Sequence, residues 1–296
     1  MAAGTVTVLG ATGKTGRAVA AAALRAGLHV RGTSRSAEQA GSGMPPPGHP
    51  DPSPAGGVSW CRVDLETGDG LAQAFAGADA AYLVMPNLHP DEVGAMTRAV
   101  RAALDAGVGR VVYHSVADPG DARMPHHLRK ALAEESVRDV CPDAVVLRPC
   151  AYQQNLTPMA LAGHLRVAYR LDAPFSLVDL DDVAQVATDA LAGTGAAPGS
   201  THVLAGPEEL TVAELAAQAG QVLGSPVTAE AVPLTEWREG PGAGLPEQEA
   251  QELAAMFAAY DETGFTADPA PLAALLGRRA TTWAELLRRL STNQRT

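Results

Sequence analysis

The sequence predicts an α/β protein built on a doubly wound parallel sheet, with a smaller, mostly helical C-terminal part. Short runs rich in β-branched residues alternate with helical stretches through the first half of the 296 residues. The first of these runs ends at a glycine-rich turn that leads into an alanine-rich helix. Alternation of this kind is typical of parallel strands with helices on both faces. A chain of this length can bury a core without disulfide or metal staples.

The elements of the first half are expected in a regular order. Glycine ends two of the helices, at Gly27 and Gly107, and Pro86 stops the fourth strand. Strands are expected over residues 6–9, 28–33, 58–63, 80–85, 110–114 and 144–147. Helices are expected over residues 16–26, 71–76, 92–106 and 128–140.

The pattern loosens after Pro149. Thr211 is expected to cap the helix that follows it, because Glu214 stands at the capping-box position. Helices are expected over residues 182–191, 211–223, 246–260 and 281–290, and a strand over 201–204. Residues 41–57 contain six prolines and five glycines, so we expect an irregular surface loop there.

The acidic composition excludes several kinds of partner. Binding to the phosphate backbone of a nucleic acid needs a basic surface, and the net charge of this chain is −11. We therefore expect no nucleic-acid partner. No run approaches the roughly 18 apolar residues of a membrane span. No signal peptide opens the chain, so we expect no membrane partner and a cytoplasmic protein. The three scattered cysteines suit buried thiols in a reducing compartment and predict no metal site.

The glycine-rich turn predicts a dinucleotide site. Gly10 permits a tight turn, Gly13 lets the backbone approach a pyrophosphate, and Gly16 lets helix and strand pack closely. The helix N-terminus then offers amide donors to anionic oxygens. We expect the cofactor to contact Gly10, Thr12, Gly13, Lys14, Thr15 and Gly16. The alternative interpretation is a simple tight turn.

A nucleoside-triphosphate P-loop is excluded by one position. Gly13, Lys14 and Thr15 match the end of that motif, but the motif requires a further glycine five residues before Gly13. Val8 stands there instead, inside the strand, and its side chain blocks a wide anion nest.

The end of the second strand favours NADP(H). Enzymes that use NAD usually place a carboxylate there for the ribose hydroxyls, and this chain has none before Glu38. Arg31 and Arg35 flank two hydroxyl side chains instead. A guanidinium with hydroxyls suits a 2′-phosphate, and we assign Arg35 to it. The alternative is a pair of solvent-exposed arginines.

Three more residues are predicted to contact the cofactor. Asp64 and Leu65 follow the third strand and are expected to border the adenine, unless Asp64 is a surface loop carboxylate. Met85, at the end of the fourth strand, completes the predicted cofactor site.

Taken together, the motifs resemble those of the NmrA-like, atypical short-chain dehydrogenases/reductases, nearly from end to end. The similar segments are residues 10–16, 30–35, 63–65, 110–115, 130–135, 147–149, 154–156, 178–184, 204–211 and 276–278. The resemblance implies a Rossmann-like, NADP(H)-binding domain and a small C-terminal substrate domain. We expect the first over residues 1–150, with 179–205 packing back on it, and the second over 151–178 and 206–296.

The chain departs from that superfamily at the catalytic residues. Mainstream members use a serine after the fifth strand and a Tyr-x-x-x-Lys pair on the next helix. Ser115 and Lys130 match the serine and the lysine, but His126 occupies the tyrosine position. We predict catalytic roles for all three, with Ser115 donating a hydrogen bond to the substrate and Lys130 also touching the nicotinamide ribose. The alternatives are a buried serine and a solvated lysine.

His126 has two interpretations. An imidazole can donate a proton near neutral pH. Alternatively, His126 only shapes the site while water or the substrate supplies the proton. Pro125 places it at the very start of its helix.

Three residues are candidates for contact with the substrate, namely Tyr113, Gln154 and Asn155. Tyr113 precedes Ser115 by two residues and so points to the same side of the strand, although a strand tyrosine is more typical of a core. A further set of apolar residues is also more typical of a core than of a pocket: Trp237, Met256, Phe257 and Tyr260.

Two functions from different classes are consistent with these features. The first is an oxidoreductase that passes hydride from NADPH to an aromatic or quinone-like small molecule, at a ketone, enone or quinone. Its narrowest version is a ketoreductase for an aromatic polyketide in antibiotic biosynthesis. The alternative is a non-catalytic NADP(H)-sensing regulator that binds a partner protein, which the missing tyrosine favours. An isomerase or dehydratase that keeps its cofactor bound is a third interpretation, and the oligomeric state is left open.

Overall fold

A computed structural model describes residues 4–35, 57–86 and 88–293. Contacts within the chain divide it into two compact units. The first unit consists of Met1–Pro119, Arg129–Arg148 and Val183–His202. The second unit consists of Gly120–Leu128, Pro149–Asp182 and Val203–Thr296. The segment 120–128 therefore groups with the C-terminal residues, although we expected it within 1–150.

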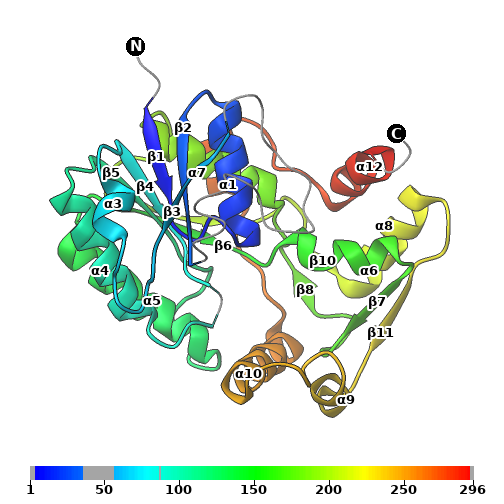
Figure 1. The fold of residues 1–296 in the computed structure, drawn as a ribbon. Coiled ribbons are helices and arrows are strands. Elements are labelled where there is room, and N and C mark those ends of the chain that lie inside the picture. The colour runs from blue at the N-terminus through cyan, green and yellow to red at the C-terminus, as the bar shows by residue number, and fades with distance from the viewer. Residues whose placement is uncertain (1–3, 36–56, 87, 294–296) are drawn as a thin grey trace. The chain divides into compact units, whose positions relative to one another are not determined.

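Seven strands form the main sheet (Figure 1), in the order β3-β2-β1-β4-β5-β6-β9. They are β1 (Thr5–Val8), β2 (His29–Ser34), β3 (Ser59–Arg62), β4 (Ala80–Leu83), β5 (Arg110–His114), β6 (Val145–Pro149) and β9 (Thr201–Leu204). The pairings from β3 through β6 are all parallel. Val6 of β1 stands opposite Val30 on one side and Ala80 on the other. The predicted α/β fold with a parallel sheet is confirmed.

Helices connect these strands. They are α1 (Lys14–Arg25), α3 (Leu71–Phe75), α4 (Glu92–Asp105), α5 (Pro125–Val140) and α7 (Leu180–Ala192). A large buried cluster joins α3, α4 and α5 to the sheet, with Phe75, Met96 and Val137 from the helices against Leu83 and Val146. The helix α1 lies on the other face (Figure 1). Helices cover both faces of the sheet because the chain first adds strands from β1 to β3 on one side of β1. It then crosses to β4 on the other side of β1 and adds the remaining strands in that direction.

The second unit carries the remaining short elements. They are a 3₁₀ turn (Gln153–Asn155), α6 (Thr157–Leu161), β7 (His164–Val167), β8 (Pro174–Phe175), β10 (Leu210–Thr211), α8 (Val212–Leu223), β11 (Thr228–Ala231), α9 (Leu234–Glu239), α10 (Glu247–Thr263), α11 (Ala270–Leu276) and α12 (Trp283–Asn293). The predicted capping box is confirmed, because Thr211 accepts from the Glu214 amide while the Glu214 side chain accepts from the Thr211 amide. The two-stranded pairs β7–β11 and β8–β10 were not expected from the sequence.

Three further expectations concern single features. All three cysteines, Cys61, Cys141 and Cys150, are buried free thiols, as expected. Of the predicted loop 41–57, all but the last residue lies outside the described residues. Within the described part of the chain, no helix is both long enough and apolar enough to cross a membrane.

Candidate functional site

The glycine turn lies at the carboxyl end of β1, where the strand order reverses between β1 and β4. The Leu9 amide donates to the Tyr82 carbonyl oxygen at 2.8 Å, which continues the pairing of these two strands. Gly10 has a φ of 71°, and a Cβ there would lie 2.5 Å from the carbonyl oxygen of Val84. Only glycine therefore fits where the chain turns off the sheet. This edge is the usual ligand position of an open parallel sheet.

The other two glycines shape the start of α1. A Cβ on Gly16 would lie 2.2 Å from the Gly10 carbonyl oxygen, so the helix approaches the turn closely because this residue has no side chain. Gly13 is the N-cap; it is exposed, and no side chain caps the helix. The nearest atom to a Cβ on Gly13 would be the Gly10 carbonyl oxygen at 3.4 Å. The turn thus presents bare backbone at a helix N-terminus, which fits a pyrophosphate.

Side chains from neighbouring elements hold the turn in place. The Gly10 amide donates to the Thr33 hydroxyl of β2 at 3.2 Å. The Arg17 guanidinium donates to the Thr12 carbonyl oxygen at 2.7 Å. Lys14 is exposed and Thr15 is half-buried at the first turn of α1. The six predicted cofactor contacts within residues 10–16 therefore lie in one loop and the first turn of one helix.

The two arginines at β2 have different environments. Arg31 donates to the carbonyl oxygens of Ala74 and Ala76, at 2.7 and 2.9 Å, and so closes the C-terminal end of α3. Arg35 is exposed and directly follows the last residue of β2. Arg31 thus has a structural role, and the assignment of Arg35 to a 2′-phosphate stays a prediction. Glu38 lies outside the described residues.

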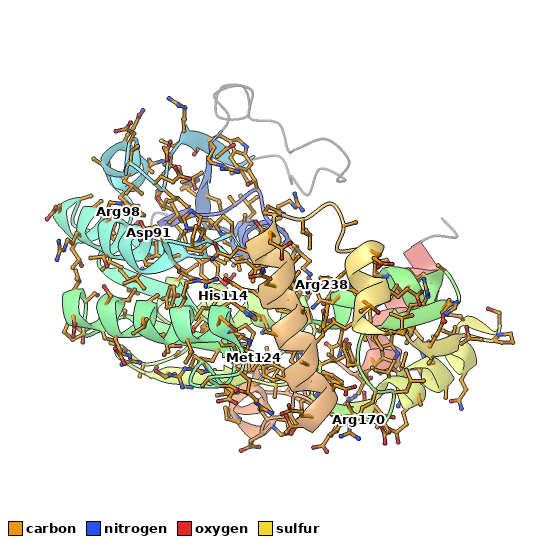
Figure 2. The ribbon with its side chains drawn as sticks, turned by 90° about the horizontal axis from the view of Figure 1, so that it is seen from below. Asp91, Arg98, His114, Met124, Arg170 and Arg238 are labelled. Carbon is orange, nitrogen blue, oxygen red and sulfur yellow. The ribbon has the colours of Figure 1, made fainter. Side chains whose placement is uncertain are left out.

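The loop after β3 is fixed by local contacts. The Asp64 carboxylate accepts from the Glu66 amide at 2.9 Å. The Leu65 carbonyl oxygen accepts from Arg98 at 2.8 Å, and Arg98 also pairs with Asp91 at 3.0 Å (Figure 2). Met85 is buried in the core that α4 covers. The assignment of Asp64, Leu65 and Met85 to the cofactor stays a prediction.

Lys130 forms a buried ion pair that the sequence did not indicate. Its ammonium group donates to the Glu92 carboxylate at 2.6 Å, and the Tyr113 hydroxyl donates to the same oxygen at 2.8 Å. Lys130 is 8% exposed and Glu92 3%. Burial and the neighbouring Glu92 carboxylate raise the pKa of Tyr113 well above its usual value. The Tyr113 side chain is fully buried. Its contact with a substrate stays a prediction.

Ser115 belongs to a second buried network. Its hydroxyl donates a short hydrogen bond to the Glu134 carboxylate, which Arg148 also binds through two nitrogen atoms, at 2.5 and 2.9 Å. The Ser115 amide donates to the Leu147 carbonyl oxygen at 2.8 Å. Since a serine hydroxyl has one proton, Ser115 in this geometry has only lone pairs to offer to a ligand. The hydrogen bond from Ser115 to a substrate stays a prediction. It requires the Ser115 hydroxyl to break its hydrogen bond with Glu134.

A third buried polar pair lies one residue before Ser115. The Tyr82 hydroxyl and His114 Nδ1 are 2.5 Å apart, and His114 lies in the interior (Figure 2). Burial, with a smaller contribution from the Lys130 charge, lowers the pKa of His114 to about 3. His114 is therefore neutral at physiological pH and does not serve as a cation.

His126 belongs to the second unit, whereas Ser115 and Lys130 belong to the first. It stands in the first turn of α5, as Pro125 predicted. Its ring is buried and meets the His127 ring edge-on, with the centroids 4.5 Å apart. The acid role of His126 stays a prediction.

Aromatic rings gather in the second unit in a continuous series of contacts. His127 meets Phe265, with ring centroids 5.7 Å apart, and Phe265 meets Tyr260 at 5.3 Å. Tyr169 meets Phe257 at 5.9 Å, and Trp237 follows. We call this series the aromatic cluster; it consists of His127, Tyr169, Phe175, Trp237, Phe257, Tyr260 and Phe265.

The aromatic cluster has a buried part and a half-buried part. Phe175, Tyr260 and Phe265 are buried, as expected of a core. Tyr169 and Phe257 are only half-buried, as is Trp237. The cluster therefore forms a core on one side and presents partly accessible ring surface on the other.

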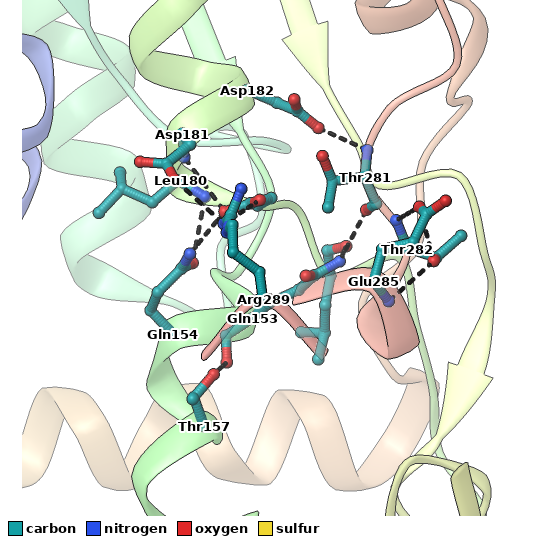
Figure 3. Close-up of polar contacts among 12 residues, drawn as sticks. Gln153, Gln154, Thr157, Leu180, Asp181, Asp182, Thr281, Thr282, Glu285 and Arg289 are labelled. Atoms are coloured by element: carbon teal, nitrogen blue, oxygen red, sulfur yellow. Dashed lines mark hydrogen bonds and ion pairs between the residues drawn. The ribbon is translucent and has the colours of Figure 1, made fainter. Parts of the chain in front are cut away.

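Gln154 and its neighbours are tied to buried aspartates (Figure 3). Gln154 donates to the Asp179 carboxylate at 2.5 Å and accepts from the Leu180 amide at 3.1 Å. Arg289 of α12 binds the same Asp179, at 2.8 Å. Asn155 is exposed at the end of the 3₁₀ turn. Gln154 thus has a structural role here, and the substrate contacts of Gln154 and Asn155 stay predictions.

The second buried aspartate ties down the segment before α12. Asp182 accepts from Arg278 at 2.7 Å and from the Thr281 amide at 2.6 Å (Figure 3). The Thr281 carbonyl oxygen accepts in turn from Gln153, at 3.1 Å. Asp179 and Asp182 together fasten the C-terminal segment to residues 149–182 of the same unit.

Sequence reasoning missed two site residues, Glu92 and Glu134. A signal for Glu134 was present in the sequence, because it follows Lys130 by four residues and so lies on the same helix face. Glu92 stands in the first turn of α4, where an acidic residue normally indicates only a favourable helix start. In the part of the chain that the structure describes, no three His, Cys, Asp or Glu side chains are grouped to hold a metal ion.

Comparison with known proteins identifies one matching family and two sequence relatives that are reductases. The profile of the NmrA-like family matches residues 2–287. A (4-alkanoyl-5-oxo-2,5-dihydrofuran-3-yl)methyl phosphate reductase from Streptomyces griseus is 36% identical over 167 residues, 54% of this chain and 57% of that protein. An NAD(P)H azoreductase from Xenophilus azovorans is 28% identical over 239 residues, 78% of this chain and 82% of that protein. The first match thus spans little more than half of that relative.

Solved structures share the fold over nearly the full length of the chain. A NADPH-dependent quinone oxidoreductase from Escherichia coli, solved with NADPH, superposes with a TM-score of 0.78. The superposition covers 97% of this chain and 99% of that one, at 22% identity.

Proposed function

The chain belongs to the NmrA-like family, and we propose that it is an NADPH-dependent reductase that transfers hydride to a ketone, enone or quinone. The observation that carries the proposal is the glycine turn at the reversal of the strand order, with Gly13 and Gly16 leaving the start of α1 open to a pyrophosphate. The reductase names of both sequence relatives support it.

The residues around the turn fit the cofactor, which would supply the hydride from its nicotinamide ring. The backbone of residues 10–16 would hold the pyrophosphate, and Arg35 the 2′-phosphate. Lys130 is the candidate for the nicotinamide ribose. Its ammonium group has three protons, so it can keep the Glu92 contact and still donate to a ribose hydroxyl.

The environment of Ser115 favours a particular kind of acceptor. Hydride addition leaves negative charge on the acceptor oxygen, and one proton must follow. Glu134 holds the Ser115 proton, so Ser115 gives little stabilisation to the negative charge on that oxygen. A hydride acceptor that delocalises the charge over its own structure is therefore favoured. Quinones and aromatic ketones do so. A ketoreductase for an aromatic polyketide in antibiotic biosynthesis is the narrowest form of the proposal.

The proton donor is assigned to His126, with water or the substrate as the alternative. A His126→Phe variant removes the titrating group but keeps a flat ring. A drop of tenfold or more in kcat, with the pH profile flattened near neutrality, supports the acid role. An unchanged kcat removes His126 from the mechanism.

A second candidate function is a non-catalytic NADP(H) sensor that binds a partner protein. The specific observation in its favour is that Ser115 and Lys130 are both hydrogen-bonded to buried glutamates, while histidine replaces the usual tyrosine. Such a protein would bind the cofactor without turning it over.

The experiment that separates the two candidates follows the absorbance of reduced nicotinamide with a panel of quinones and aromatic ketones. Turnover with any of them, at a rate that depends on enzyme concentration, supports the reductase. Micromolar NADPH binding without turnover across the panel supports the sensor. A Gly13→Val variant serves as the control, because its side chain would fill the open start of α1 and should abolish both binding and turnover.

A further inference from the structure

Three arginines lie on or directly after β2 and β3, and they have different partners. Arg31 is bound to the end of α3. Arg62 is the last residue of β3 and stands opposite Ser34, the last residue of β2. Arg35 follows Ser34 directly. Because β2 and β3 are parallel, Arg62 and Arg35 emerge at the same edge of the sheet as the glycine turn.

A hydrogen bond joins Arg62 to the backbone of Arg35. The Arg62 Nε donates to the Arg35 carbonyl oxygen at 3.4 Å. That bond orients the Arg62 guanidinium towards the end of β2 and leaves its two terminal nitrogens for another partner. Both side chains are exposed, and among the described residues neither forms an ion pair with a carboxylate. The two arginines carry like charges at the same end of the sheet, which suits an anionic ligand.

We propose that Arg62 is a second specificity-determining residue, which binds the 2′-phosphate of the cofactor together with Arg35. The inference rests on the proposed use of NADPH. A phosphate dianion accepts several charge-assisted hydrogen bonds, and two guanidinium groups can donate to different oxygens of it. NADH lacks this group, so Arg62 adds affinity for NADPH alone.

The test measures nucleotide affinity rather than turnover. Titration of the protein with NADPH and NADH, followed by the fluorescence of the reduced nicotinamide, gives both Kd values. Arg62→Ala should raise the Kd for NADPH by roughly tenfold or more, as expected for the loss of a charge-assisted bond, and leave the Kd for NADH within about twofold. Arg62→Lys keeps the charge without the planar fork and should recover part of the loss.

Arg25→Ala is the matched control. Arg25 is an exposed arginine of the same unit, in the last turn of α1, which leads back to the start of β2. Its removal changes the net charge equally but lies at the opposite edge of the sheet. Both Kd values should stay unchanged.

Competition with adenosine 2′-monophosphate and adenosine 5′-monophosphate isolates the phosphate subsite. The 2′-isomer should displace NADPH more effectively than the 5′-isomer from the wild type, and Arg62→Ala should reduce the difference, since Arg35 remains. Equal effects of Arg62→Ala on NADPH and NADH, or no effect on either, would overturn the inference while the proposed cofactor stands. A wild-type protein that binds neither nucleotide overturns the proposed function itself.

Discussion

The buried pair of Lys130 and Glu92 allows a quantitative prediction. Glu92→Gln preserves the shape of the side chain and an acceptor for the Tyr113 hydroxyl, but it leaves the Lys130 ammonium buried without its counter-charge. Removing one partner of a buried ion pair costs about 3–5 kcal/mol. Since Lys130 is only 8% exposed, solvent recovers little of that loss. Lys130→Met should cost a similar amount, because it leaves the Glu92 carboxylate buried with one hydrogen bond.

The double variant Glu92→Gln/Lys130→Met separates the charge effect from packing. It removes both charges, keeps the Tyr113 hydrogen bond and fills the space of the lysine stem. Neutral replacement of a whole buried pair is often close to neutral in stability, within about 1–2 kcal/mol. The double variant should therefore be more stable than either single variant.

Urea denaturation, monitored by circular dichroism, gives the four free energies of unfolding that the double-mutant cycle requires. Thermal midpoints should agree, since about 1 kcal/mol corresponds to roughly 2–4 °C in a chain of this size. Single variants within about 1 kcal/mol of wild type, or a double variant no more stable than the singles, would refute the reasoning. Either result would mean that the two side chains interact with solvent rather than with each other.

Three further predictions test other parts of the structure. Gly16→Ala places a carbon 2.2 Å from the Gly10 carbonyl oxygen, so it should cost about 1–3 kcal/mol in urea denaturation and weaken NADPH binding; unchanged values of both would contradict the close helix approach. The pKa of His114, about 3 in the folded protein against 6.5 in the unfolded chain, means that only the unfolded state takes up this proton as the pH falls below 6.5. Between pH 7 and 5 the wild type should therefore lose about 2 kcal/mol more unfolding free energy than His114→Gln, and parallel profiles would disprove the neutral buried state. Asp182→Asn removes the negative charge that Arg278 binds, and the Arg278 side chain is 47% exposed, so the free energy of unfolding should fall by about 1–2 kcal/mol, measured by thermal denaturation; a variant as stable as wild type would show that the segment is held by other contacts.

The fold and the cofactor turn were predictable because their signals are local. A strand, three glycines and an alanine-rich helix stand within about 20 residues of one another, and each has a conformational preference that needs no distant partner. The capping box at Thr211 is equally local and was confirmed. The family resemblance, which depends on the order of many such motifs, was confirmed for the same reason.

The hydrogen-bond networks around the predicted catalytic residues were not predictable. Glu92 lies 38 residues from Lys130 and 21 from Tyr113, and a single sequence gives no register between elements so far apart. The pairing of β7 with β11 joins residues even farther apart in the sequence, such as His164 and Thr228. Each strand has only four residues; β7 alternates between exposed and buried residues but β11 does not, and a single sequence does not indicate that two such short runs pair. The sequence did not indicate Arg62, because the feature that distinguishes NAD from NADP(H) sites in a sequence stands at the end of β2 and not of β3.

The different exposure of the two lysines allows one of them to be labelled selectively. The chain contains only Lys14 and Lys130; Lys14 is exposed at the start of α1, whereas Lys130 is buried beside Glu92. An amine-reactive dye should therefore attach to the folded protein at one side chain, apart from the α-amino group. That side chain borders the glycine turn, so the dye would sit beside the cofactor site and report its occupation directly, without mutagenesis and without knowledge of the substrate.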